Sequence, residues 1–143
     1  NVTTYAGVMG QSAQVDGAIA VARFQAPHQV AFAPDGALYV VDGASIGVIR
    51  RIAPDGSSVS TLAGAFSVYG IAVDAAGTIY FGSPSGLQVM VPGGVPNVLI
   101  PSGAAVVLGS TNPRLMNVDG LAILGPKKLV ILSGAQILMA TLP

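Results

Sequence analysis

Residues 24–64 have the sequence FQAPHQVAFAPDGALYVVDGASIGVIRRIAPDGSSVSTLAG, in which short apolar or β-branched runs alternate with turn signals. Such runs favour β-strands, and the two Pro-Asp-Gly triplets, at residues 34–36 and 54–56, favour tight turns. Strands at this spacing are typical of an antiparallel sheet in which each strand pairs with the next. The segment therefore predicts four strands, at residues 29–33, 37–42, 46–53 and 57–63.

The composition restricts the class of protein. Of 143 residues, 52% are hydrophobic and 8% are charged, whereas an average soluble domain has about 25% charged residues. Six Lys and Arg balance six acidic residues, all of them Asp, so the formal net charge is zero. A neutral chain lacks the basic surface that phosphate binding needs, and we expect no nucleic-acid partner. With so few charges, much of the surface is expected to be covered by other chains.

The sequence excludes several kinds of chemistry and bears on the location of the protein. The absence of Cys removes disulfides, thiolate nucleophiles and Cys-bound metals from consideration. Gly, Pro and Asp interrupt every apolar run before it reaches the roughly 18 residues of a membrane helix, so we predict no membrane span. The chain starts at Asn1 rather than Met, which fits removal of a signal peptide as well as a trimmed chain. We expect an extracellular or cell-surface location.

Two later stretches repeat the first one. Residues 71–81 match residues 30–40 at an offset of 41, and residues 120–123 match residues 70–73 at an offset of 50. The repeating pattern resembles the NHL repeat of β-propellers, on Phe24, Pro27, Val30, Ala31, Asp35, Gly36, Leu38, Tyr39, Val40 and Asp42. The resemblance implies an all-β propeller of four-stranded antiparallel blades, each with its first strand lining a central channel.

The repeats divide the chain into one segment of three blades. Residues 2–7 match residues 59–64, the last strand of the first repeat, whereas the third repeat lacks such a strand. The predicted parts are, in order, a strand at 1–7 that completes a last blade, a connection at 8–22, blade 1 at 23–65, blade 2 with a following loop at 66–111, and blade 3 without its fourth strand at 112–143.

Three blades are too few for a closed ring, because propellers typically have about 4–8 blades. We therefore expect the chain to associate with itself, as a homodimer that closes a six-bladed ring or as a filament if the rotation does not close. The N-terminal strand of one chain is then expected to pair with the last strand of another. The residues predicted to make this contact are Val2, Thr4, Tyr5, Ile137 and Met139.

The candidate ligand-binding residues are His28, Tyr69 and Asp119, which hold equivalent positions just before the first strand of each blade. This position implies the mouth of the central channel, where propeller lyases and lactonases gather metal ligands from several blades. One His per chain, with no Glu, makes a poor metal site. We therefore predict no metal, no cofactor and no catalytic residue, with a ligand, if any, that is a small molecule or glycan.

Most other polar residues have structural explanations. Asp35 and Asp55 lie in Pro-Asp-Gly turns, where Asp accepts hydrogen bonds from its own backbone two residues on. Asp42 ends a strand and is expected to bond neighbouring turn amides. Arg50 and Arg51 are adjacent in a strand and point to opposite faces, so one of them can pair with an Asp of a neighbouring blade.

We expect a non-enzymatic NHL-type propeller module, for interaction or structure, that self-assembles through blade docking and exchange of its N-terminal strand. The alternatives are a metal-dependent propeller enzyme similar to the lyases and lactonases, centred on His28 and Asp119, and a ring that binds a ligand at the channel mouth. Lys127 and Lys128 follow a Gly-Pro turn and are expected to form a solvated tip. A propeller fold does not by itself determine the function.

Overall fold

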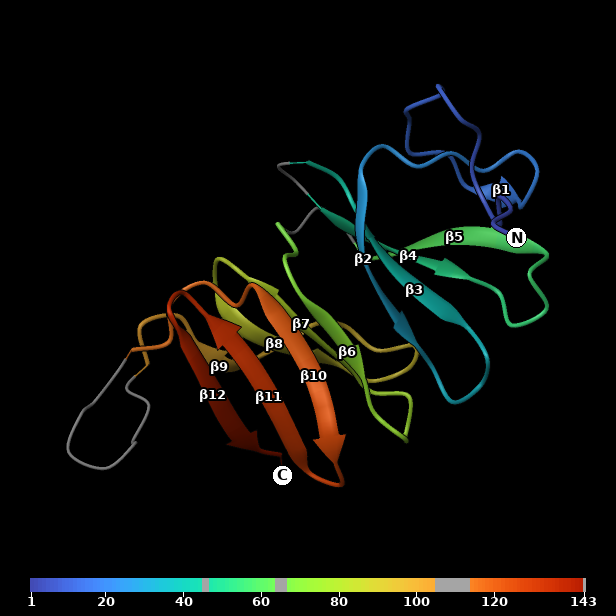
Figure 1. The fold of residues 1–143 in the computed structure, drawn as a ribbon. Coiled ribbons are helices and arrows are strands. Elements are labelled where there is room, and N and C mark those ends of the chain that lie inside the picture. Colours follow the sequence, from blue (N-terminus) through green and yellow to red (C-terminus); the bar gives the residue numbers. More distant parts are fainter. Residues whose placement is uncertain (45–46, 64–66, 105–113, 143) are drawn as a thin grey trace. The chain divides into compact units, whose positions relative to one another are not determined.

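The computed structural model describes residues 1–44, 47–63, 67–104 and 114–142, and every regular element among them is a β-strand (Figure 1). The all-β, antiparallel prediction is confirmed. The chain divides into two compact units, Asn1–Ser67 and Val68–Pro143, which we call unit 1 and unit 2. No described residue belongs to a helix long and apolar enough to cross a membrane. Residue 46 of the third predicted strand, and most of the predicted loop after blade 2, lie outside the described residues.

Unit 1 contains one antiparallel sheet, sheet 1, with the strand order β1-β5-β4-β3-β2 (Figure 1). Four of these strands follow one another in sequence, as the Pro-Asp-Gly turns predict. The fifth, β1, comes from the predicted connection and pairs with the outer strand β5. The bounds are β1 Gly17–Ala18, β2 Pro27–Phe32, β3 Leu38–Asp42, β4 Val48–Ile52 and β5 Ser58–Ala63.

Residues 1–6 form no strand in the single chain, and their predicted pairing with a second chain is not tested by it. They lie on sheet 1 instead, where Tyr5 covers Gly56 and Ala6 packs against a small core that includes Val40 and Ile52. Most of the segment remains exposed, including Val2 and Tyr5, and the exposed fraction of Tyr5 is 62%. Its contact with Ile137 and Met139 of another chain stays untested.

Unit 2 contains two sheets. Sheet 2 has the strand order β6-β7-β8-β9, and sheet 3 has the order β10-β11-β12 among the residues described. Their bounds are β6 Ile71–Val73, β7 Ile79–Ser83, β8 Gly86–Met90 and β9 Asn97–Pro101 in sheet 2, and β10 Gly120–Gly125, β11 Lys128–Ser133 and β12 Gln136–Thr141 in sheet 3.

The pairing of strands repeats at the offsets that the sequence predicts. The first hairpin of each sheet contains the same cross-strand pair: Val30↔Val40, Ile71↔Phe81 and Leu121↔Ile131. Partners differ by 41 residues between sheets 1 and 2, and by 50 between sheets 2 and 3. Each position in one first hairpin therefore has a defined equivalent in the other two.

Sheets 2 and 3 share one core within unit 2. Sheet 2 contributes Tyr80 and Leu87, sheet 3 contributes Leu129 and Ile131, and Val118 enters from the segment before β10. A fully buried side chain of this size contributes about 1.5–3 kcal/mol through the hydrophobic effect, so this core accounts for the contact between the two sheets.

The other face of sheet 3 is apolar and exposed. Its members alternate along the strands with the buried core residues, as side chains on opposite faces of a strand do. They are Leu124, Leu132, Ile137 and Met139, and the exposed fraction of Ile137 reaches 75%. We call these four residues the outer face of sheet 3.

Candidate functional site

Tyr69 and Asp119 lie at equivalent places, directly before β6 and β10. The amide of Tyr69 donates to the carbonyl of Gly82 at 3.1 Å, and the amide of Asp119 donates to that of Leu132 at 2.9 Å. Because Gly82 and Leu132 are themselves equivalent, each residue extends its hairpin in the same way. The repeat thus places Tyr69 of one sheet and Asp119 of the next at the same end of β6 and β10.

Two glycines bring these residues side by side. A Cβ on Gly70 would lie 2.9 Å from Gly120 Cα and 3.2 Å from the carbonyl carbon of Asp119. The backbones at the starts of β6 and β10 are therefore in contact, directly after Tyr69 and Asp119. A larger residue at position 70 would force the strands, and with them the phenol and the carboxylate, apart.

Both side chains are accessible. The side chain of Tyr69 is 38% exposed, and Asp119 is exposed as well. One carboxylate oxygen of Asp119, Oδ2, accepts a long hydrogen bond from the Gly134 amide at 3.4 Å. No described residue engages the other oxygen, so it can interact with a water molecule or a ligand.

His28 lies at the equivalent position of sheet 1, inside a β-bulge. Pro27 pairs with Asp42 and Gln29 pairs with Val41, which leaves His28 as the extra residue. Bulges redirect side chains and are common next to active sites. His28 is exposed and belongs to unit 1, so the proximity that the structure shows is that of Tyr69 and Asp119 in unit 2.

The described residues do not supply a metal site. No three His, Asp or Glu side chains among them lie close enough together to hold an ion. The residue at the equivalent place on the adjacent strand is Tyr69, which carries a phenol rather than a carboxylate or an imidazole. Metal chemistry of the kind that the resemblance implies does not fit this set, and no step below depends on it.

A buried ion pair fixes the segment that leads into β2 of sheet 1. Arg50 and Asp42 are both fully buried, and Arg50 Nη1 donates to Asp42 Oδ2 at 3.0 Å. Asp42 Oδ1 accepts hydrogen bonds from the amides of Gln25 and Ala26 at 2.9 and 2.8 Å. Asp42 thus bonds backbone amides, as predicted, but those of the segment before β2 rather than those of the turn that follows it. This pair positions the chain just before His28.

Arg50 also ties the preceding connection to sheet 1. Its Nη2 atom donates to the carbonyl of Val15 and to Asp16 Oδ1, both at 2.8 Å. Its guanidinium group lies 5.1 Å from the centre of the Phe24 ring, a distance that allows a cation–π interaction. The expectation of an Asp from a neighbouring blade is wrong for Arg50, because its acidic partners all belong to unit 1.

The same buried position has different chemistry in each sheet. In sheet 2, Ser83 and Gln88 replace Asp42 and Arg50, and Gln88 Nε2 donates to Ser83 Oγ at 2.7 Å. In sheet 3 the pair is Ser133 and Leu138, and Ser133 Oγ accepts a hydrogen bond from the Met116 amide at 2.9 Å. Ser83, Gln88 and Ser133 are buried and hydrogen-bonded, so they support their sheets rather than act on a ligand.

Asp16 is a structural residue that the sequence analysis missed, since only an Asp-Gly pair marks it. Burial disfavours its charged form, but hydrogen bonds from the Thr61 amide and hydroxyl and from Arg50 outweigh burial. Together they lower the pKa of Asp16 below its ordinary value of 3.8. Asp16 thus joins β5, β4 and the connection through one carboxylate.

Substitution of Asp16 by Asn is expected to reduce the free energy of unfolding at pH 7 by at most about 1 kcal/mol, because its side chain is half exposed. A carboxyl group with a lowered folded-state pKa stabilises the fold above its unfolded-state pKa, and loses that effect as the pH falls through the folded-state value. The difference between Asp16→Asn and the unmodified protein should therefore shrink below about pH 4. Urea unfolding at pH 7 and pH 3 measures it, and a difference of equal size at both pH values would contradict the assignment.

Comparison with known proteins gives a similarity of fold but no match of sequence family. No family model matches the chain, and no curated protein matches it. Among solved structures, a gluconolactonase from Xanthomonas campestris is similar, with a TM-score of 0.60 and 22% sequence identity over 85% of this chain. The chain spans 39% of the length of that protein. This similarity and the antiparallel sheets define the class, an all-β protein with a propeller-like fold.

The similarity corrects the expected function. We expected a non-enzymatic module that self-assembles, but the solved protein of similar fold is an enzyme, which favours the enzymatic alternative. The expectation rested on few charges and on an unpaired strand count. Those features bear on whether other chains cover the surface, and they carry no information about the chemistry beside the first strand of each sheet.

Proposed function

We propose that this chain forms three blades of a propeller enzyme that hydrolyses lactones of sugar acids. The observation that carries the proposal is the fold similarity to a gluconolactonase over 85% of the chain. It is supported by His28, Tyr69 and Asp119, three accessible polar side chains at one repeat position. Each of these side chains lies near the start of the first strand of its sheet and is exposed to solvent.

Hydrolysis of a lactone needs a base that activates water and a donor that stabilises the developing oxyanion. In our proposal the free oxygen of Asp119 takes a proton from water, and the resulting hydroxide attacks the lactone carbonyl carbon. The Tyr69 hydroxyl donates to the carbonyl oxygen as it becomes negative. The ring C–O bond then breaks, the leaving oxygen takes up the proton, and the product is a hydroxy acid.

We further propose that the sheets are NHL-type blades of a six-bladed ring, in which a second copy of the chain covers the outer face of sheet 3. Ala72, Tyr80 and Leu87 of sheet 2 pack against sheet 3. Their equivalents on sheet 3 are Ala122, Val130 and Ile137, which are apolar in the same way. A surface with the composition of an observed blade contact is suited to receive another blade.

Lactone hydrolysis by the purified full chain tests the proposed activity. With glucono-δ-lactone as substrate and acid release as the signal, we expect a rate above spontaneous hydrolysis. Asp119→Asn should reduce that rate about 100-fold, a typical contribution of a general base, and Tyr69→Phe should reduce it about 10-fold. His28→Ala tests whether the third equivalent position takes part.

Asp35→Asn is the matched control, because Asp35 serves a hairpin turn, where it accepts from the Ala37 amide and pairs with Arg51. It should leave the rate unchanged. A rate no higher than spontaneous hydrolysis between pH 6 and pH 8, with and without added divalent cations, would refute the lactonase proposal. Full activity in Asp119→Asn would refute the assigned base.

A further inference from the structure

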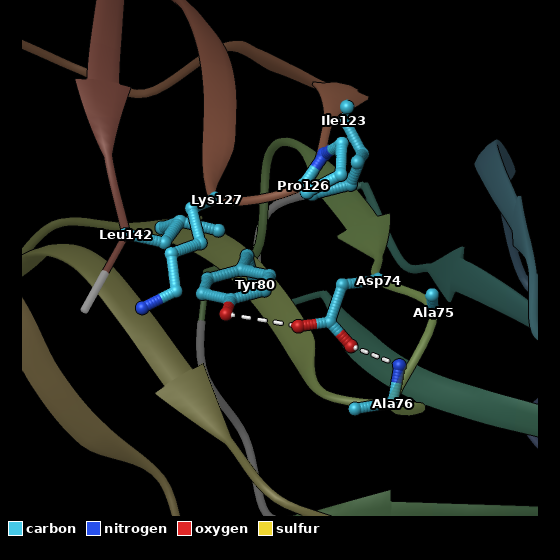
Figure 2. A pocket seen from close by; sticks show the side chains of 9 residues that line it. Asp74, Ala75, Ala76, Tyr80, Ile123, Pro126, Lys127 and Leu142 are labelled. Carbon is cyan, nitrogen blue, oxygen red and sulfur yellow. Dashed lines mark hydrogen bonds between the residues drawn. The ribbon is translucent and has the colours of Figure 1, made fainter.

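A cavity of about 440 Å³ opens at the hairpin tips of sheets 2 and 3, within unit 2 (Figure 2). It lies at the opposite ends of β6 and β10 from Tyr69 and Asp119, so it is separate from the proposed lactone site. Its volume is within the range of roughly 300–1,000 Å³ that small-molecule sites occupy. The residues that define it are Asp74, Tyr80, Ile123, Pro126, Lys127 and Leu142.

Lys127 has an unusual backbone conformation. Its φ angle is 59°, and it is the one non-glycine residue with positive φ in the described part of the chain. By the repeat offsets, Lys127 is equivalent to Gly36 and Gly77, whose φ angles are 89° and 81°. Glycine adopts this backbone conformation without steric cost, whereas in other residues the Cβ atom clashes with the backbone. Sheet 3 thus places a strained lysine where the other two sheets have glycine.

The strained residue borders the cavity. Figure 2 shows the stem of the Lys127 side chain passing the Tyr80 ring, with its ammonium end on the side of the ring away from Asp74. Strained conformations of this kind are found at ligand-binding positions, where the gain in function compensates for the steric cost. We expected Lys127 to lie in a solvated tip, but solvation does not explain why lysine occupies a turn position that holds glycine in the other two sheets.

The acidic group in the cavity is already satisfied. Asp74 Oδ1 accepts from the amides of Ala76 and Thr78, both at 2.9 Å, and Oδ2 accepts from the Tyr80 hydroxyl at 3.1 Å (Figure 2). Burial, together with the bond to Asp74, raises the pKa of Tyr80, so the phenol stays neutral near pH 7. Asp74 therefore closes its own turn and orients Tyr80 as a wall of the cavity.

The ammonium group of Lys127 has no such partner. No described residue forms a hydrogen bond or an ion pair with it. The remaining lining is apolar and comes from Ala75, Ala76, Ile123, Pro126 and Leu142. The cavity therefore combines apolar walls with one positive charge that no described group neutralises.

We propose that this cavity binds a small carboxylate with an apolar body, such as a medium-chain fatty acid. The carboxylate pairs with the Lys127 ammonium group, and the apolar body lies against Tyr80, Ile123 and Leu142. A neutral molecule of the same shape would leave the exposed ammonium hydrated and would gain no ion pair. An organic cation would be repelled by Lys127 and would find Asp74 already bonded.

Titration of octanoate into the purified full chain, followed by calorimetry, tests the proposal. Octan-1-ol is the comparison ligand, because it has the same apolar body without the charge. We expect saturable binding of octanoate that is about five-fold tighter than that of octan-1-ol, the upper range for a partly exposed ion pair. Lys127→Met should abolish this preference, since it keeps the apolar stem and the strained backbone but removes the charge.

Lys128→Met is the matched control, because the next residue is also exposed but does not line the cavity. It should retain the preference for octanoate. Lys127→Gly should lose the preference and raise the melting temperature by a few degrees, because glycine relieves the strain at this turn. Equal binding of the two ligands, no binding of either at millimolar concentration, or an unchanged preference in Lys127→Met would overturn the proposal.

Discussion

Arg50→Met is expected to lower the free energy of unfolding of unit 1 by about 3–5 kcal/mol, the usual cost of removing one partner of a buried ion pair. Both Arg50 and Asp42 are fully buried, so the substitution leaves a carboxylate in the core without its counter-charge. It also removes the donors to the carbonyl groups of Val15 and Arg23, which hold the connection in place. Urea unfolding monitored by circular dichroism measures the change.

Arg51→Met is the matched control for this experiment. Arg51 is the next residue on the same strand, but its partner Asp35 is about half exposed, so the loss should stay below about 1 kcal/mol. A loss of similar size for both substitutions would contradict the role assigned to the buried pair.

The pair in sheet 2 offers a rescue of the same substitution. The double variant Asp42→Ser/Arg50→Gln copies Ser83 and Gln88, which form a buried hydrogen bond at the equivalent position. We expect it to be more stable than Arg50→Met, because no unpaired charge remains in the core. A double variant no more stable than Arg50→Met would show that the connection, rather than the charge, determines the cost.

Gly82→Ala is expected to destabilise unit 2 by about 3 kcal/mol, at the upper end of the cost of overpacking a core. A Cβ at this position would lie 2.1 Å from the carbonyl oxygen of Val118 and 2.6 Å from its Cβ. The nearest atom belongs to a backbone that leads directly into β10, so it cannot move without displacing Asp119. Thermal unfolding should show a melting temperature lower by several degrees.

Gly94→Ala provides the steric control. Its Cβ would first meet Val91 Cγ2, a methyl group of an exposed side chain in a surface turn that has room to shift, and Gly94 has no positive φ that would add strain. We expect a loss below about 1 kcal/mol. If Gly82→Ala were as mild as Gly94→Ala, the close passage of the segment before β10 over β7 would be wrong.

The strands and their repetition could be predicted from the sequence, because both depend on local chemistry. Alternating apolar residues and Pro-Asp-Gly turns place four strands of sheet 1, β2 to β5, within two residues of their observed bounds, whereas β1 was not predicted. The offsets of 41 and 50 residues recur in the observed pairing, since equivalent residues meet equivalent partners. The backbone bonds of Asp35 and Asp55 within their turns were predictable for the same reason.

The tertiary structure alone decided which residues meet across the chain. Arg50 and Asp16 are 34 residues apart, and no local pattern links them. Gly82 replaces the valine of the first sheet because the segment before β10 passes over it, a contact that no repeat pattern contains. Lys127 looked like a solvated residue until its conformation and the adjacent cavity were known. Local propensity determines where a strand begins and ends, whereas packing of distant segments determines which side chains are buried, strained or left without a partner.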